Sequence, residues 1–148
     1  MPSSGLKHED PLNPSLTPLE QAVMDRLLAG EHPILTALRK QLENATISSR
    51  QFSGVGFFTY FRVPETVPHV PSPNGRLIFG DVNGEIKGVK HGAGFVLFLD
   101  QTGYLDMLEG YTYDDNWPED TSDFKLSYND PTRKKLMDYL EEEQKGKG

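Results

Sequence analysis

The chain of 148 residues contains no cysteine. Disulfide bonds, cysteine-ligated zinc, iron–sulfur clusters and thiol catalysis are therefore excluded together. Long hydrophobic runs are also missing, because the longest one, residues 95–99, has the length of a strand and falls far short of the roughly 18 apolar residues of a membrane span. Residues 1–18 hold no apolar core of the kind that a secretory signal needs. From these absences we expect a cytoplasmic protein that needs no cofactor.

Basic side chains are absent from one long segment. Between Lys90 and Lys125 there is no lysine or arginine, whereas eight of the 22 carboxylates stand there. They are Asp100, Asp106, Glu109, Asp114, Asp115, Glu119, Asp120 and Asp123. The remaining 14 carboxylates nearly balance the 15 lysines and arginines, so this acidic segment accounts for the net charge of −7. Such a charge argues against binding to a nucleic-acid backbone and favours a basic protein partner.

The first elements that we expect are two helices. Residues 17–20, Thr-Pro-Leu-Glu, form a capping box with proline at the first helical position, and the helix that follows ends at Gly30. Pro33 begins a second helix, whose apolar residues recur at helical spacing. For the organisation of the whole chain, we expect a flexible arm over 1–16, one domain over 17–140 and a flexible tail over 141–148.

The remainder of the domain has the pattern of strands. From residue 57 apolar and aromatic residues alternate with a period of two. We expect strands over 57–63, 76–82, 85–90, 94–99 and 104–113, a compatible short edge strand over 124–128, and a last helix from Pro131. Asn83-Gly84 predicts a tight hairpin turn. The element order predicts an α+β fold, with an N-terminal helical pair on one face of an antiparallel meander of four to five strands and a short C-terminal helix. The opposite face would then stay open.

The strand expected over 104–113 contains a candidate catalytic residue. Alternation places one set of side chains on the same face: Leu105, Met107, Glu109, Tyr111 and Tyr113. Among apolar neighbours the carboxylate of Glu109 would be desolvated and its pKa raised. A similar alternation places Asp81 with Leu77 and Phe79, and His91 lies at a glycine-flanked turn nearby. Together with Glu109, these two residues would form a general acid/base group or a metal site lined by tyrosines.

An ordinary structural explanation exists for the same three residues. Gly110 can mark a bulge that shifts the register and turns Glu109 outward. Asp81 stands just before Asn83-Gly84 and can bond the backbone of that turn. His91 stands beside the glycines of a turn, where histidine is a common residue. The structural explanation is the stronger of the two, so Glu109, Asp81 and His91 remain candidates for a site.

The acidic loop that follows this strand contains the single tryptophan, Trp117. An aromatic anchor ringed by carboxylates is typical of an interface that binds a basic partner. The residues that we expect at such an interface are Trp117, Tyr111, Tyr113, Asp114, Asp115 and Glu119. In the alternative arrangement Trp117 folds back on the sheet as a lid. The carboxylate spacing does not match an EF-hand, so we expect a solvated loop with no metal.

Aromatic residues are concentrated in the first expected strand. We expect Phe57, Phe58, Tyr60, Phe61 and Phe79 to lie in the core, with a ligand cavity lined by these rings as the alternative.

Two segments carry a resemblance to known sequences. GAGFVLFLD at 92–100 and LEGYTYDDNWPED at 108–120 resemble a group of small bacterial proteins without assigned activity, and the resemblance extends from about Leu27 to Pro118. It implies a bacterial source and a compact α+β domain. It carries over no functional residues.

Two functions remain open at this point. The first is a non-enzymatic interaction module, similar to an immunity protein, whose acidic and aromatic surface binds a basic partner. The second is a small-molecule-binding protein or enzyme that uses Glu109 with Asp81 or His91 in a tyrosine-lined pocket. A homodimer formed through the open sheet face is compatible with either function.

Overall fold

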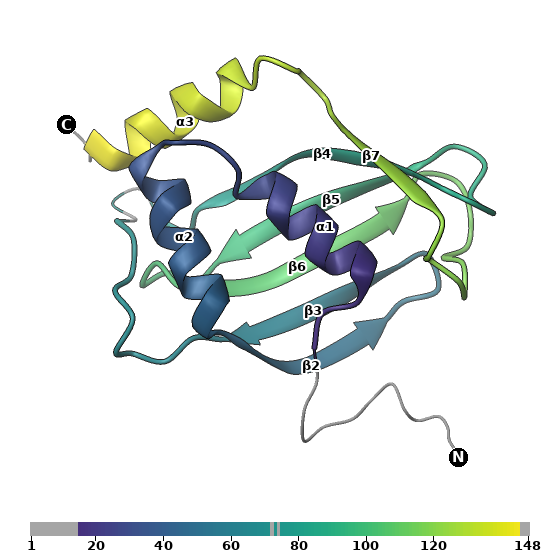
Figure 1. Cartoon of the computed structure of the whole chain (residues 1–148), viewed down its shortest axis with the longest axis horizontal. Coiled ribbons are helices and arrows are strands. Elements are labelled where there is room, and N and C mark those ends of the chain that lie inside the picture. Colours follow the sequence, from purple (N-terminus) through teal and green to yellow (C-terminus); the bar gives the residue numbers. More distant parts are fainter. Residues whose placement is uncertain (1–14, 72, 74, 146–148) are drawn as a thin grey trace.

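The computed structural model describes residues 15–71, 73 and 75–145. Its elements are α1 (Pro18–Leu27), α2 (Pro33–Asn44), β2 (Thr46–Phe52), β3 (Gly56–Arg62), β4 (Ile78–Ile86), β5 (Ala93–Leu99), β6 (Leu105–Thr112), β7 (Phe124–Tyr128) and α3 (Lys134–Lys145). The α+β class and the order of helices before and after the sheet are confirmed (Figure 1).

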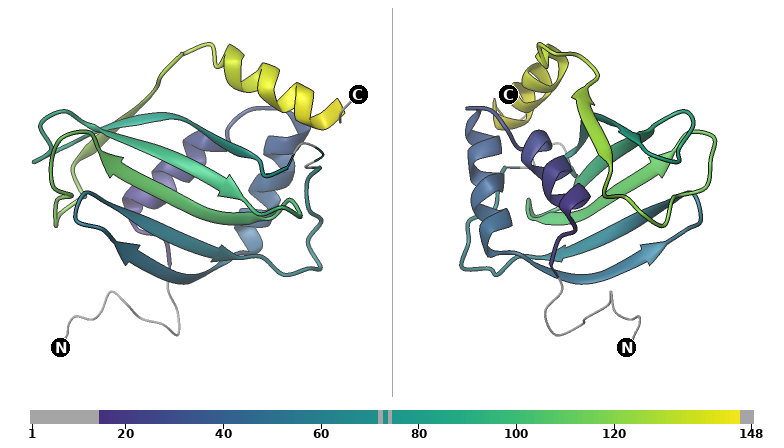
Figure 2. Two further views of the ribbon diagram at one scale, coloured as in Figure 1. Left: turned by 180° about the vertical axis from the view of Figure 1, so that it is seen from behind. Right: turned by 45° about the vertical axis from the view of Figure 1, so that its right-hand side comes forward.

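The strands form one six-stranded antiparallel sheet in the order β2-β3-β6-β5-β4-β7. Helices α1 and α2 lie on one face of this sheet, and in the view from behind no described helix crosses the other face (Figure 2). Leucine, valine, isoleucine and phenylalanine side chains from α1, α2 and the covered face make a continuous core, with Phe95 of β5 only 1% exposed within it. Burial of this apolar surface holds the two layers together.

The start of each N-terminal helix follows from local sequence. The Thr17 hydroxyl accepts a hydrogen bond from the Glu20 N–H at 3.1 Å, and the Glu20 carboxylate accepts one from the Thr17 N–H at 2.8 Å, so the predicted capping box is confirmed. Helix α2 begins at Pro33, and the His32 ring accepts a hydrogen bond from the Ile34 N–H at 3.1 Å. Gly30, with φ of 122°, allows the sharp bend between the helices.

The predicted hairpin at Asn83-Gly84 is wrong. Strand β4 runs straight through both residues, and each pairs on both sides, with β5 and with β7. Packing around position 84 is tight, since a Cβ there would lie 3.1 Å from both the Phe95 ring and the Leu126 side chain. The chain turns back later, between β4 and β5, where Gly88 and Gly92 have φ of 95° and 82°.

The sheet has more strands than the four to five predicted. Strand β2 was missed because its sequence, TISSRQF, is polar and six of its seven residues lack full burial, as an edge strand permits. The topology is also more than a meander, because β3 pairs with β6 rather than with the strand that follows it in the chain. The edge strand compatible with 124–128 is present as β7.

The C-terminal helix differs in its bounds from the prediction. It begins at Lys134 rather than at Pro131, after Arg133 adopts φ of 55°, and it continues through Lys145. Residues 141–145, which we assigned to a tail, therefore lie in a helix. Most of the predicted N-terminal arm, and residues 146–148, fall outside the described residues.

Gly110 gives a direct test of the packing between β3 and β6. A Cβ at this position would lie 2.3 Å from Cε2 of Phe57, which is 4% exposed. We expect Gly110→Ala to lower the free energy of unfolding by about 1–3 kcal/mol, measured by urea denaturation, because a crowded core must shift to accept the methyl group. The double variant Phe57→Leu/Gly110→Ala should lose less than the sum of the single losses. Additive losses would show that the ring does not rest on Gly110.

Candidate functional site

The helix-free face of the sheet carries a continuous group of apolar and aromatic side chains. Register places them in neighbouring rows, with Phe58, Glu109 and Val96 in one row and Tyr60, Met107 and Phe98 in the next. Tyr111 stands one row further on, between two glycines. We call these residues the sheet platform: Phe58, Tyr60, Val96, Phe98, Met107, Glu109 and Tyr111. All seven are partly exposed, so no part of the described chain fully covers them.

Glu109 is the one charged member of the sheet platform. Strands β3, β6 and β5 pair continuously through Glu109 and Gly110, so the bulge considered at Gly110 is absent. Burial among these neighbours raises the pKa of the Glu109 carboxyl above its ordinary value. Within the described part of the chain, no cationic side chain forms an ion pair with it. The prediction of a desolvated carboxylate on this face therefore agrees with the geometry.

Two tyrosines extend the sheet platform toward the end of β6. The rings of Tyr111 and Tyr113 meet edge to face, with centroids 5.5 Å apart. Tyr113 is 54% exposed, and its hydroxyl donates a hydrogen bond to Asn83 Oδ1 at 3.0 Å. Burial, the neighbouring Tyr113 and the charge of Glu109 raise the pKa of Tyr111. The two tyrosines and Glu109 are therefore close enough for the charge of one to affect the pKa of another.

The structure corrects the placement of two of the aromatic residues that we expected in the core. Phe57, Phe61 and Phe79 are buried, as expected for core residues. Phe58 and Tyr60, which we expected in the core, point to the helix-free face and are only partly buried. Strand alternation in β3 requires this split, because neighbouring residues face opposite sides of a sheet.

Asp81 does not join Glu109. Its carboxylate accepts two hydrogen bonds from the Arg133 guanidinium, at 2.7 and 3.1 Å. Arg133 is itself buried and donates to the backbone carbonyls of Leu27 and Ala29 near the end of α1. Asp81 therefore faces the helices and has a structural role there.

His91 is also separate from Glu109. It lies in the exposed turn before β5, and its Nδ1 is 3.5 Å from a carboxylate oxygen of Asp114. No described cavity is lined by Glu109 together with Asp81 or His91. Among the described residues, no group of three or more histidine or acidic side chains could hold a metal ion. The predicted catalytic or metal cluster is therefore not assembled.

Several carboxylates of the acidic segment stabilise turns. Asp100 Oδ1 accepts hydrogen bonds from the N–H groups of the three residues from Thr102 to Tyr104. Asp115 accepts one from the Lys90 N–H at 2.6 Å, and Asp120 accepts two from Ser122. The segment is thus partly used by the fold, which explains part of its composition.

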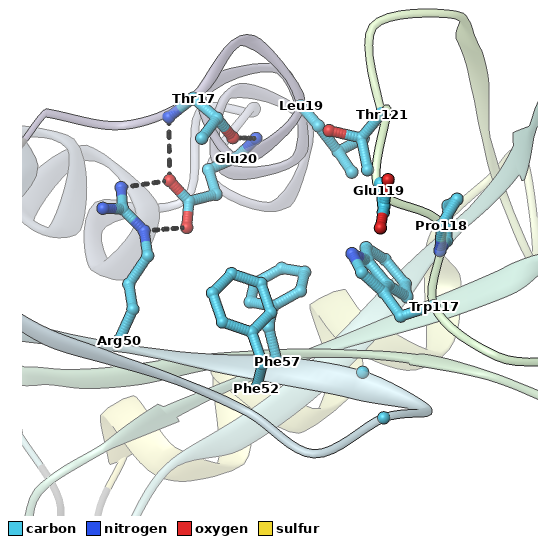
Figure 3. Close-up of a pocket in the computed structure, with 12 residues that line it drawn as sticks. Thr17, Leu19, Glu20, Arg50, Phe52, Phe57, Trp117, Pro118, Glu119 and Thr121 are labelled. Carbon is cyan, nitrogen blue, oxygen red and sulfur yellow. Dashed lines mark hydrogen bonds and ion pairs between the residues drawn. The ribbon is translucent and has the colours of Figure 1, made fainter. Parts of the chain in front are cut away.

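Trp117 folds back on the sheet, as in the second of the two arrangements considered for it. Its ring packs edge to face on Phe57, with centroids 5.1 Å apart, and its backbone N–H donates a hydrogen bond to the Gly54 carbonyl at 2.8 Å. It lies on the helix side of the sheet, where it lines a cavity of about 400 Å³ between the start of α1, the β2–β3 hairpin and residues 117–121 (Figure 3). The predicted interface is therefore split between two sides: Tyr111 and Tyr113 are on the helix-free side, and Trp117 and Glu119 are on the other.

A buried ionic network forms one wall of this cavity. The Glu20 carboxylate, 3% exposed as a residue, accepts hydrogen bonds from Arg50 Nε at 2.9 Å and Nη2 at 2.6 Å (Figure 3). It accepts another from the Thr59 hydroxyl. Burial by itself would raise the pKa of Glu20, but the bonds from Arg50, Thr59 and Thr17 outweigh it and hold the pKa below its usual value.

This network was missed at the sequence level. The capping box identified Glu20, but its bond to a residue 30 positions later leaves no local signal. Arg50 stands in the polar segment that also hid strand β2. An arginine inside an otherwise uncharged, polar edge strand is the one hint that the sequence contained.

Comparisons of the chain with models of known protein families, with curated proteins and with solved structures found no match. No relative therefore assigns a role to the sheet platform or to the cavity. Among the described residues, no helix combines the length and apolar character that crossing a membrane requires.

The ionic network predicts a strong and specific loss of stability. Arg50→Met leaves Glu20 as a buried charge without its main partner, and we expect a loss of about 3–5 kcal/mol in the free energy of unfolding. The double variant Glu20→Gln/Arg50→Met removes both charges and should be more stable than Arg50→Met alone. Urea denaturation at neutral pH measures both. Equal stability of the single and the double variant would contradict a buried ion pair.

The raised pKa of Glu109 predicts that the stability of the protein depends on pH. Because the pKa of Glu109 is raised in the folded state, its ionisation opposes folding. The free energy of unfolding should therefore fall as the pH rises from the ordinary pKa of 4.5 through the raised pKa. We expect Glu109→Gln to raise the free energy of unfolding at pH 7 relative to wild type, and this gain to disappear below pH 4. Glu142→Gln, at an exposed position on α3, is the control and should show no such pH-dependent gain.

Proposed function

We propose that the protein is a non-enzymatic interaction module that binds a basic protein partner on the sheet platform. The observation that carries the proposal is Glu109, a half-buried carboxylate without an ion-pair partner in the described chain, on a helix-free sheet face. Desolvation of an unpaired carboxylate is unfavourable, and a lysine or arginine from a partner would offset it.

The surroundings of Glu109 suit a cationic side chain. Phe58 of β3 is the cross-strand partner of Glu109 on β6, and Tyr111 follows two residues later along β6 on the same face. Aromatic faces beside a carboxylate attract ammonium and guanidinium groups by both charge and quadrupole. The apolar row of Tyr60, Met107 and Phe98 would supply buried area around this contact.

The remaining charges at the end of β6 favour the same sign of partner. Tyr113, which is more exposed than Tyr111, is followed by Asp114 and Asp115. Carboxylates at the rim of an interface accelerate association with a basic protein and make it sensitive to salt. We therefore expect the anchor of the interface to be Tyr111 and Tyr113 with Glu109, in place of Trp117.

The alternative of an enzyme built on Glu109 with Asp81 or His91 has little support in the geometry. Asp81 is engaged by Arg133, and His91 stands near Asp114. Glu109 lies on an open sheet face rather than in a described cavity. A general acid or base needs a substrate held within hydrogen-bond reach, and neither of the proposed partner residues stands beside Glu109 to form such a site.

A photocrosslinking experiment tests the proposal. A photoreactive amino acid replaces Val96 on the sheet platform, and a matched variant carries it at Lys40, an exposed position on α2. In source cells, we expect the Val96 variant to crosslink to a basic protein that the Lys40 variant does not capture. The purified partner should bind less tightly as salt is raised.

Charge variants decide whether Glu109 carries the binding. Glu109→Gln should weaken the affinity of that partner by about 30-fold or more, because its cation would lose a desolvated carboxylate, whereas Glu142→Gln should leave the affinity unchanged. Crosslinks at position 96 to a second copy of this chain alone would replace the proposal with a homodimer. An affinity that Glu109→Gln leaves intact would also contradict it.

A further inference from the structure

The cavity on the helix side of the sheet has an aromatic corner. Phe52 and Phe57 are cross-strand partners in the β2–β3 hairpin, and the Trp117 ring meets Phe57 at an interplanar angle of 66°. All three rings line the cavity, and Trp117 packs directly against Phe57, with ring centroids 5.1 Å apart (Figure 3). Three rings therefore bound one space of about 400 Å³, which is within the usual size range of small-molecule sites.

Phe52 is the most exposed of these rings. It is 71% exposed, which makes it the most exposed large apolar side chain among the described residues. Its neighbour Phe57 is 4% exposed, so Phe57 provides the floor while Phe52 offers a free ring face. A large aromatic side chain left open at the edge of a cavity gives a ligand apolar area to cover.

The charges around the cavity favour a cation. Arg50 is engaged by Glu20 through two hydrogen bonds, so this pair contributes no net charge. Glu119 is the other charged residue in the lining, and Figure 3 shows its carboxylate beside the Trp117 ring. Because the Glu20–Arg50 pair is neutral as a whole, Glu119 sets the net charge of the lining, and a cation would meet this carboxylate together with the negative faces of the rings.

We propose that this cavity binds a small organic cation of the quaternary ammonium class, held by Phe52, Trp117 and Glu119. A quaternary ammonium group is bulky, weakly hydrated and unable to donate hydrogen bonds, so aromatic faces replace its hydration at little cost. The carboxylate of Glu119 compensates its charge from the rim. Phe57 lines the cavity and its neighbour Phe58 lies on the sheet platform, so the two sites are on opposite sides of the sheet. The cavity site therefore goes beyond the proposed partner binding and does not depend on it.

The single tryptophan reports directly on this site. Choline is the probe, and 3,3-dimethylbutan-1-ol is its neutral control of the same shape. We expect choline to change Trp117 fluorescence saturably and to shift the NMR signal of the Trp117 indole N–H, with the alcohol binding at least about tenfold more weakly because it lacks the charge. Equal binding of the two would overturn the cation site, and so would the absence of a saturable response in both measurements.

Variants separate the aromatic contribution from the acidic one. Phe52→Leu keeps an apolar side chain at an exposed position, so the fold should be preserved, and choline affinity should fall about three- to tenfold with loss of the ring face. Glu119→Gln should also weaken choline, whereas Glu142→Gln should not. Choline binding that survives both cavity variants unchanged would place the cation elsewhere and overturn the assignment. Partner capture by the sheet platform is measured separately, so either proposal can fail alone.

Discussion

The buried carboxylate of Glu20 joins the first helix to the edge of the sheet. It closes the capping box of α1 and at the same time accepts hydrogen bonds from Arg50 on β2 and Thr59 on β3. A carboxylate that is 3% exposed needs such partners, since a buried charge without them is strongly destabilising. The orientation of α1, the course of the polar edge strand β2 and the wall of the aromatic cavity all depend on this one group.

From this arrangement follows the difference between the two faces of the sheet. With α1 and α2 on one side, alternate residues of β3, β5 and β6 enter the core, and the others form the sheet platform. The covered face is completed by core packing, whereas the platform retains partly exposed aromatic rings around a desolvated carboxylate. A sheet face of this composition is better satisfied by another molecule than by water. That is the physical basis of the proposed interaction.

Charge is used in three different ways in this small domain. Buried pairs, Glu20 with Arg50 and Asp81 with Arg133, position the helices. Asp100, Asp115 and Asp120 bond the backbone of turns, which accounts for part of the acidic segment. Glu109 and Glu119 have neither role among the described contacts, and each stands beside aromatic rings on a different side of the sheet. These two carboxylates are therefore the groups on which the functional proposals rest.

Local signals in the sequence determined where most elements begin and what class of fold they make. The structure reproduces three short-range patterns: the capping box at Thr17, the helix start at Pro33 and the period-two alternation of β6 from Met107 onward. Leu105, which the same alternation placed beside Met107, is instead buried in the core, because the register shifts at the start of β6. Strand alternation also placed Glu109 beside Met107 and Tyr111. Only tertiary structure decided the pairing of β3 with β6, the passage of β4 through Asn83-Gly84, the side on which Trp117 packs and the union of Glu20 with Arg50. Each of these depends on contacts between residues far apart in the chain, where cross-strand packing overrides the local turn or strand preference.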